Sequence, residues 1–230
     1  MSWLGPQEWQ AVLLSLKVAF WATALSLPVA IFTAYALARW VFYGRQALNI
    51  LVHLPLVMPP VVTGYLLLVL FGTQGPLGVA LEAIGLSIAF RWTGAVLAAA
   101  IMAFPLMVRA IRLSIEAVDP ALEEAAATLG ASRVWAFATV TLPLALPGIL
   151  AGAVLGFAKA MGEFGATITF VSNIPGETQT LPSAVYAFLQ VPGGESSALS
   201  LVLIAVVVAT GALVASEILA QRMNRKASGE

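Results

Sequence analysis

Two opposite charges inside one apolar stretch are the residues of this chain best suited to chemistry. Lys159 and Glu163 lie within a mostly apolar run from 146 to 170. A charged side chain within a membrane is costly and normally faces protein or water. Their spacing of four places both on one face of a helix, where they can pair. We consider two interpretations: the pair lines a path for a transported solute, or it is a neutral ion pair that holds two helices together.

Prolines interrupt a second apolar stretch. Pro55, Pro59 and Pro60 lie within residues 48–71. Each proline lacks an N–H group, so a helix that contains it has backbone carbonyls without their usual partners. One interpretation is a simple kink. The other is a bent helix that lines a pore, with Thr63 beside it.

The sequence offers no constellation for catalysis or metal binding. It contains no cysteine, which excludes disulfides, thiol nucleophiles and thiolate metal sites, and His53 is its single histidine. We find no nucleophile and base at a catalytic spacing and no carboxylate pair. The formal net charge is zero, so no basic footprint indicates nucleic acid. We expect a protein that is not an enzyme, holds no cofactor of its own and binds no nucleic acid.

Composition and length predict a membrane protein. The chain has 230 residues, of which 60% are hydrophobic and 10% are charged, whereas soluble domains carry about 25% charged residues. A spanning helix needs about 20 mostly apolar residues. The stretches that qualify are 12–38, 48–71, 93–111, 146–170 and 199–220. We therefore predict an all-α integral membrane protein of about five spans. The two longer loops, 72–92 and 171–198, hold apolar stretches too short to span.

The distribution of basic residues predicts the orientation. The basic residues that follow the first, third and fifth spans are Arg39, Arg45, Arg109, Arg112, Arg133, Arg222, Arg225 and Lys226. The opposite loops hold only Arg91. Since cytoplasmic loops carry an excess of Lys and Arg, we expect a periplasmic N-terminus and a cytoplasmic C-terminus. A sixth span would place the N-terminus inside or reverse this bias. No polar linker divides the chain, so we expect one domain at 8–217 and a short cytoplasmic tail at 218–230.

One long cytoplasmic segment, residues 115–147, predicts two helices joined by a tight turn. Asp119 reads as an N-cap followed by proline at the first helical position, and Gly130 as the residue that stops the first helix. Ser132 is placed to cap a second helix. We expect this helix to extend through Thr139 and to be ended by Leu142-Pro143. The segment either rests on lipid headgroups or docks another protein. Small side chains at 125–127 favour docking, because they allow close approach of a second backbone.

This segment resembles the EAA motif of ABC-importer permeases. The matching positions are Glu124-Ala125-Ala126, Gly130, Val140 and Leu142-Pro143 at the family spacing, with Val140 where the family has isoleucine. The resemblance implies that the segment is a coupling helix that enters a groove of a separate ATPase subunit. The residues expected to couple to the ATPase are Glu124, Ala125, Ala126, Thr128, Leu129, Gly130, Leu142 and Pro143.

Two other stretches resemble the molybdate branch of this family, and the likeness extends from Glu8 to about Glu217. One stretch runs from Gly162 to Glu177 and the other from His53 to Val62. The resemblance implies a type I ABC importer permease fold. The residues expected at the translocation path or its gate are Pro59, Pro60, Thr63, Lys159, Gly162, Glu163, Gly165 and Thr167. Because a carboxylate repels an oxyanion, we expect Glu163 to shape a gate rather than to bind the ion.

The function implied by this resemblance is ATP-driven import of molybdate, and of tungstate, across the bacterial inner membrane. The implied assembly has two copies of the permease, two cytoplasmic ABC ATPase subunits and a periplasmic oxyanion-binding protein. The chain has no GxxxxGK[ST] loop, so ATP and Mg must be bound by another chain. Entry of a dianion into a cell that is negative inside costs roughly 4.6 kcal/mol per 100 mV, which calls for an energy source.

Three alternatives stay open at the level of sequence. In the first alternative, the protein is an importer permease of the same kind, but the transported ion is sulfate or another oxyanion. The second is a secondary transporter driven by an ion gradient, which predicts internal repeats and paired broken helices. The third is a membrane enzyme such as an intramembrane hydrolase. We see no convincing repeat and no catalytic dyad, and neither of the last two explains the cytoplasmic segment.

Overall fold

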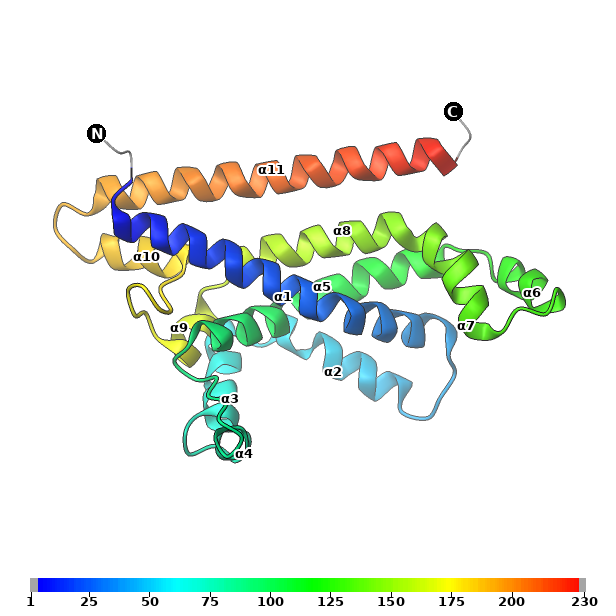
Figure 1. The fold of residues 1–230 in the computed structure, drawn as a ribbon, viewed down its shortest axis with the longest axis horizontal. Helices are drawn as coiled ribbons and strands as arrows, with labels where there is room; N and C mark the ends of the chain where they lie inside the picture. Colours follow the sequence, from blue (N-terminus) through cyan, green and yellow to red (C-terminus); the bar gives the residue numbers. More distant parts are fainter. Residues whose placement is uncertain (1–3, 228–230) are drawn as a thin grey trace.

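The computed structural model describes residues 4–227, with side chains for 4–215, 217 and 218. Every regular element in this part of the chain is helical, which confirms the all-α prediction. Three long helices form the core: α1 (Pro6–Arg39), α5 (Trp92–Glu116) and α8 (Leu142–Met161). A fourth, α11 (Glu195–Ala227), lies along one side of them (Figure 1).

Small residues allow the core helices to approach closely. On α8, Gly148, Gly152 and Gly156 form a row at intervals of four residues that faces α5. A Cβ atom at Gly148 would lie 2.1 Å from the Cβ of Ser114, and one at Gly156 would lie 2.5 Å from the Sδ of Met107. Membrane helices have no hydrophobic drive to associate in lipid, so close packing and hydrogen bonds such as that from Ser114 Oγ to the Ala145 carbonyl hold them together.

Within residues 4–227, four helices are long and apolar enough to cross a membrane, and a bent pair makes a fifth candidate. The predicted spans 12–38, 93–111 and 199–220 lie inside α1, α5 and α11. The short stretch at 181–189 is α10 (Leu181–Leu189), and the loop after the second span holds α4 (Pro76–Glu82). By their length and composition, these helices confirm the prediction of about five spans.

The second predicted span is not one continuous helix. It consists of α2 (Arg45–Val57) and α3 (Pro60–Phe71), which meet at an angle of 114°. Pro59 has an extended ψ of 133°, and two successive prolines supply no N–H groups to a helix. A proline also disfavours helical geometry in the residue before it. The interpretation as a simple kink is therefore wrong, and α3 and α4 project away from the core (Figure 1).

The fourth predicted span, 146–170, is wrong at both ends. At its far end α8 stops at Met161, and a separate short helix, α9 (Gly165–Val171), follows. At its near end the helix does not begin after Leu142-Pro143. It runs on from α7 (Arg133–Ala136) through a π-helical turn, η1 (Phe137–Thr141), directly into α8. The wider turn bonds the Leu142 N–H to the Phe137 carbonyl, so Pro143 falls at the start of α8, where its missing N–H is tolerated.

The helical hairpin and the α1–α2 connection lie at one end of the molecule. The hairpin comprises α6 (Pro120–Thr128) and α7, and it lies far from α9 and α10 (Figure 1). Arg39, Arg45 and Arg133 all lie at this end, because Arg39 contacts Glu123 of α6, Arg45 bonds the Leu37 carbonyl and Arg133 begins α7.

Candidate functional site

The hairpin is built by local capping contacts. The Asp119 carboxylate accepts a hydrogen bond from the Ala121 N–H at 2.9 Å, and Pro120 follows at the first helical position. Gly130 has a φ of +90°, a conformation that side chains disfavour, and it reverses the chain after α6. The Ser132 hydroxyl accepts from the Trp135 N–H at 3.2 Å. The predicted N-cap, turn and second cap are all confirmed.

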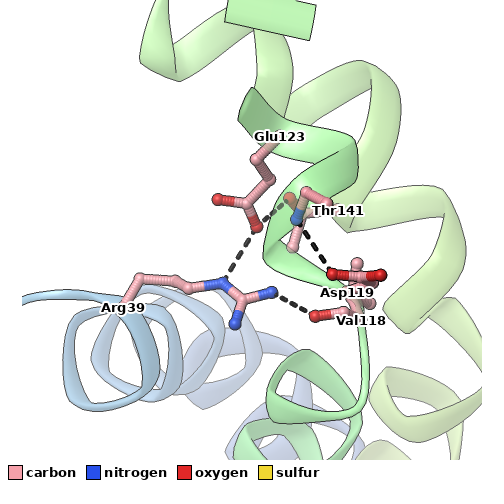
Figure 2. Close-up of polar contacts among 6 residues, drawn as sticks. Arg39, Val118, Asp119, Glu123 and Thr141 are labelled. Carbon is pink, nitrogen blue, oxygen red and sulfur yellow. Dashed lines mark hydrogen bonds and ion pairs between the residues drawn. The ribbon is translucent and has the colours of Figure 1, made fainter. Parts of the chain in front are cut away.

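A carboxylate that the sequence analysis did not single out joins the hairpin to the core. The Glu123 Oε1 atom accepts from Arg39 Nε at 2.9 Å and from Thr141 Oγ1 at 2.7 Å (Figure 2). Arg39 Nη2 also donates to the Val118 carbonyl at 2.7 Å. Residues 39 and 123 are 84 positions apart, so no local spacing signals this contact.

The predicted coupling residues form an exposed surface beside this junction. Glu124, Ala125, Thr128 and Gly130 are exposed, Ala126 is half-buried, and Leu129 is 89% exposed. Exposed apolar side chains continue on the same hairpin at Leu122, Val134 and Trp135. Leu142 is half-buried and Pro143 exposed at the start of α8. Exposed apolar side chains that lie together, here around Glu124, are typical of a surface that binds another protein.

The second set of predicted residues lies at the break between α8 and α9. Lys159 Nζ contacts Glu163 Oε2 at 2.7 Å, which confirms that the two side chains pair. The other oxygen of Glu163 accepts from the Ala166 N–H at 3.0 Å. One carboxylate therefore bridges the last turn of α8 and the first turn of α9, where the helix dipoles favour a cation and an anion respectively. The Glu163 side chain is 1% exposed and that of Lys159 is 30% exposed.

The two proline- and glycine-rich breaks pack against each other. A Cβ atom at Gly165 would lie 2.7 Å from the Cβ of Pro60, and one at Gly64 would lie 2.5 Å from the Ala166 carbonyl oxygen. α3 and α9 thus touch along their backbones. The structure brings together the predicted path residues Pro59, Pro60, Thr63, Lys159, Gly162, Glu163, Gly165 and Thr167 around this contact.

Two threonines in this region differ in their hydrogen bonding. The Thr167 hydroxyl is buried and donates to the Phe164 carbonyl at 2.9 Å. The Thr63 hydroxyl is buried and has no partner among the described residues. A buried hydroxyl without a partner is costly, so among the predicted path residues Thr63 has a hydroxyl free to form a new polar contact.

The predicted coupling residues and the predicted path residues lie in two separate regions joined by α8. The twenty residues of α8 span about 30 Å from one to the other. Within the described residues, no group of three His, Cys, Asp or Glu side chains lies close enough together to hold a metal ion. The single histidine, His53, bonds the Asn49 carbonyl through Nδ1 at 2.8 Å.

Comparison with known proteins places this arrangement in a transporter family. The family described as "Binding-protein-dependent transport system inner membrane component" matches residues 26–225. The molybdenum transport system permease protein ModB of Escherichia coli (strain K12) is 59% identical over 227 residues, which cover 98% of this chain and 99% of that protein. The protein of the same name from Haemophilus influenzae is 56% identical over 220 residues, covering 95% of this chain and 96% of that one.

A more distant relative and two solved structures complete the comparison. The sulfate transport system permease protein CysT of Salmonella typhimurium is 34% identical over 186 residues, covering 81% of this chain and 67% of that protein. A bacterial ABC transporter that imports alginate has a TM-score of 0.75 at 19% identity, covering 95% of this chain and 80% of that chain. The MetNI methionine ABC transporter has a TM-score of 0.69 at 15% identity, covering 94% of each chain.

The likeness to solved structures establishes the fold, that of type I ABC importer permeases, and the relatives establish the family. Such permeases are transport subunits, not enzymes, and lie in the inner membrane as multi-pass proteins. The chain belongs to the family of binding-protein-dependent transport system inner membrane components.

Proposed function

We propose that this chain is the permease subunit of an ATP-driven importer that carries molybdate, and with it tungstate, across the inner membrane. The observation that carries the proposal is the 59% identity to a molybdenum permease over 98% of the chain. The exposed hairpin adds a physical reason, since it offers a surface on which a separate ATPase can act. Tungstate follows from its chemistry, because it has the same charge and tetrahedral shape as molybdate.

The hairpin is the proposed coupling element. Glu124, Ala125, Ala126, Thr128, Leu129 and Gly130 would enter a groove of the ATPase, which binds ATP and Mg. The start of α8, at Leu142 and Pro143, would then carry the displacement into the membrane. An unbroken helical course from Arg133 to Met161 supports this role, since a continuous helix transmits displacement along its axis.

The contact between α3 and α9 is the proposed gate of the translocation path. Glu163 holds Lys159 and the first turn of α9 together, so a change in that ion pair would alter the break itself. Gly165 and Pro60 lie at the point of closest backbone approach. Glu163 is almost fully buried between these groups, which suits a gate better than a binding site for an oxyanion.

The proposed assembly follows from the same argument. Two copies of the permease, two cytoplasmic ABC ATPase subunits and a periplasmic oxyanion-binding protein would form the importer. The hairpin end of the molecule would face the cytoplasm, with the N-terminus periplasmic and the C-terminus cytoplasmic. The gathering of Arg39, Arg45 and Arg133 at that end supports the orientation. Residues 8–217 would form one transmembrane domain and 218–230 a short tail; α11 continues through the start of this tail to Ala227, and 228–230 lie outside the described residues.

Uptake of radiolabelled oxyanions by a deletion strain tests the function. The strain should lose accumulation of ⁹⁹Mo-molybdate, and the gene for this chain should restore it. Unlabelled tungstate should compete for uptake, and excess sulfate should not. Sulfate is the second candidate, favoured by the 34% identity to a sulfate permease. Loss of sulfate uptake with normal molybdate uptake would refute the first proposal and support the second. Vanadate-resistant uptake would instead indicate a secondary transporter.

A further inference from the structure

The hairpin helix α6 is held to the protein by almost no apolar packing. None of its residues is buried, and Leu122, its one large apolar side chain, is 46% exposed. A surface helix normally keeps its place by burying an apolar stripe. Apolar contact therefore contributes little to the position of α6 relative to the membrane helices, and polar contacts carry more of it.

We propose that Glu123 is the positioning residue that locks α6 to both α1 and the α7–α8 helix, so that a displacement of the hairpin moves these spans as one body. This inference rests on the proposed function, in which an ATPase acts on the hairpin. It adds that the displacement reaches α1 directly through Glu123, in addition to its course along α8.

The geometry of Glu123 fits a junction of three elements. Its Oε1 atom receives one hydrogen bond from Arg39, the last residue of α1, and another from Thr141, the last residue of η1. Thr141 is fully buried, and the side chains of Arg39 and Glu123 are 14% and 20% exposed. A partly buried, hydrogen-bonded pair of this kind is screened less than a surface ion pair.

A separate contact keeps α1 and η1 together without α6. The rings of Tyr35 on α1 and Phe137 on η1 lie with their centroids 4.6 Å apart. Arg39 also keeps its bond to the Val118 carbonyl, which does not involve Glu123. Loss of the Glu123 carboxylate should therefore release α6 while the membrane helices stay packed, and the exposed residues Glu124 and Leu129 should remain available to the ATPase.

The first test measures ions transported per ATP hydrolysed by the complex, purified with its ATPase and binding protein and reconstituted in vesicles. Glu123→Ala should lower this ratio about tenfold, the middle of the range for coupling between sites. ATP hydrolysis and co-purification of the ATPase should persist. Glu123→Gln should lower the ratio less, because its amide oxygen can still accept from Thr141.

A matched control lies nearby. Arg112 and Glu116 form a more exposed ion pair within α5, at 28% and 38% side-chain exposure. Glu116→Ala should leave the ratio unchanged, because Glu116 contacts only Arg112 of its own helix. Arg112 also bonds the Asn49 side chain of α2 through Nη1, and that bond does not require Glu116. An unchanged ratio in Glu123→Ala would overturn the proposal. Loss of the ATPase from the Glu123→Ala complex would also overturn it, because Glu123 would then belong to the docking surface.

The absence of cysteine from the chain permits a rescue experiment. The double variant Arg39→Cys with Glu123→Cys should be uncoupled, and a short bismaleimide that bridges the two thiols should restore transport per ATP. If bridging instead stops uptake, the two elements must separate during the cycle, and the proposal is wrong.

A second variant, at Glu124, distinguishes failure of this inference from failure of the proposed function. Glu124→Arg, on the exposed face of α6, should remove the ATPase from the complex if the hairpin is the coupling element. If Glu124→Arg removes the ATPase while Glu123→Ala transports normally, only the inference about Glu123 fails. If Glu124→Arg keeps the ATPase and full uptake, the coupling function itself is wrong.

Discussion

The hairpin and the α8–α9 break each depend on one glutamate, but the two carboxylates work in different surroundings. Glu123 joins residues 84 and 18 positions away at a partly exposed surface. Glu163 joins residues four and three positions away and is 2% exposed. The attachment of the hairpin to the core therefore depends on contacts between distant residues, whereas the break depends on a buried local pair. Substitutions at the break should cost stability, and substitutions on the hairpin should cost coupling.

The largest effect on stability should come from Glu163→Ala. The change leaves Lys159 without its partner and removes the cap on the Ala166 N–H. Loss of one member of a buried ion pair costs about 3 to 5 kcal/mol, and the 30% exposure of Lys159 places the expected loss at the lower end, about 3 kcal/mol. The thermal unfolding midpoint in detergent measures it.

A double substitution tests whether the unpaired charge of Lys159 causes this loss of stability. Lys159→Met combined with Glu163→Gln should recover part of the lost stability, since no unpaired charge remains. If Glu163→Gln alone supports full molybdate uptake from an intact complex, Glu163 has no role in the gate.

The next largest effect should come from Gly64→Ala. The new Cβ would lie 2.5 Å from the Ala166 carbonyl oxygen, a backbone atom that cannot move aside alone. Separation of α3 from α9 should cost about 1 to 3 kcal/mol, as overpacking usually does, and should reduce uptake. Gly211→Ala is the matched control, because among the described residues no atom beyond its chain neighbours and its own helix backbone lies within 4 Å of its Cβ position. Equal behaviour of the two variants would exclude a tight α3–α9 contact.

A smaller effect is expected from Asp119→Ala at the start of the hairpin. The substitution removes the N-cap bond to Ala121, which is worth about 1 kcal/mol to a helix. Asp119→Asn retains a capping oxygen and should restore most of the loss. Hydrogen exchange at the first amides of α6 measures the change. If exchange rises equally in α5 and α8, the loss of stability is not local to the start of α6.

The smallest effect on stability should come from Leu129→Asp. This side chain is 89% exposed, and substitutions at such sites stay within about 0.5 kcal/mol. Uptake should nonetheless be lost, because a charge replaces an apolar contact proposed for the ATPase. If the variant keeps its unfolding midpoint but transports no molybdate, the loss of transport comes from lost coupling and not from misfolding. Normal uptake would remove Leu129 from the docking surface.

Local signals made much of the hairpin predictable from sequence. Asp119, Gly130 and Ser132 act on their immediate neighbours, and each does in the structure what its residue type favours. The spacing of Lys159 and Glu163 likewise predicted their contact. Long apolar stretches were sufficient to predict α1, α5 and α11.

The features that the sequence did not predict depend on contacts between distant residues or on helix breaks that hydropathy does not reveal. Hydropathy does not reveal that α8 stops at Met161, because the residues of α9 are as apolar as those of a span. Pro143 usually ends a helix, but a π-helical turn accommodates it here. The packing of Gly64 on Ala166 and the contact of Arg39 with Glu123 join residues remote in sequence. No single-sequence pattern specifies such pairs.

The most direct test of the coupling site is a single cysteine placed on the hairpin of this cysteine-free chain. Leu129→Cys, treated with a thiol crosslinker in native membranes, should form an adduct with the ATPase subunit. Leu86→Cys should form none, because Leu86 is also exposed, at 55%, but lies after α4 and lines a pocket with Leu14 and Lys17 of α1, away from the hairpin. A Leu129→Cys thiol that gives no ATPase adduct, or that reacts with a membrane-impermeant reagent added from the periplasm, would contradict the account.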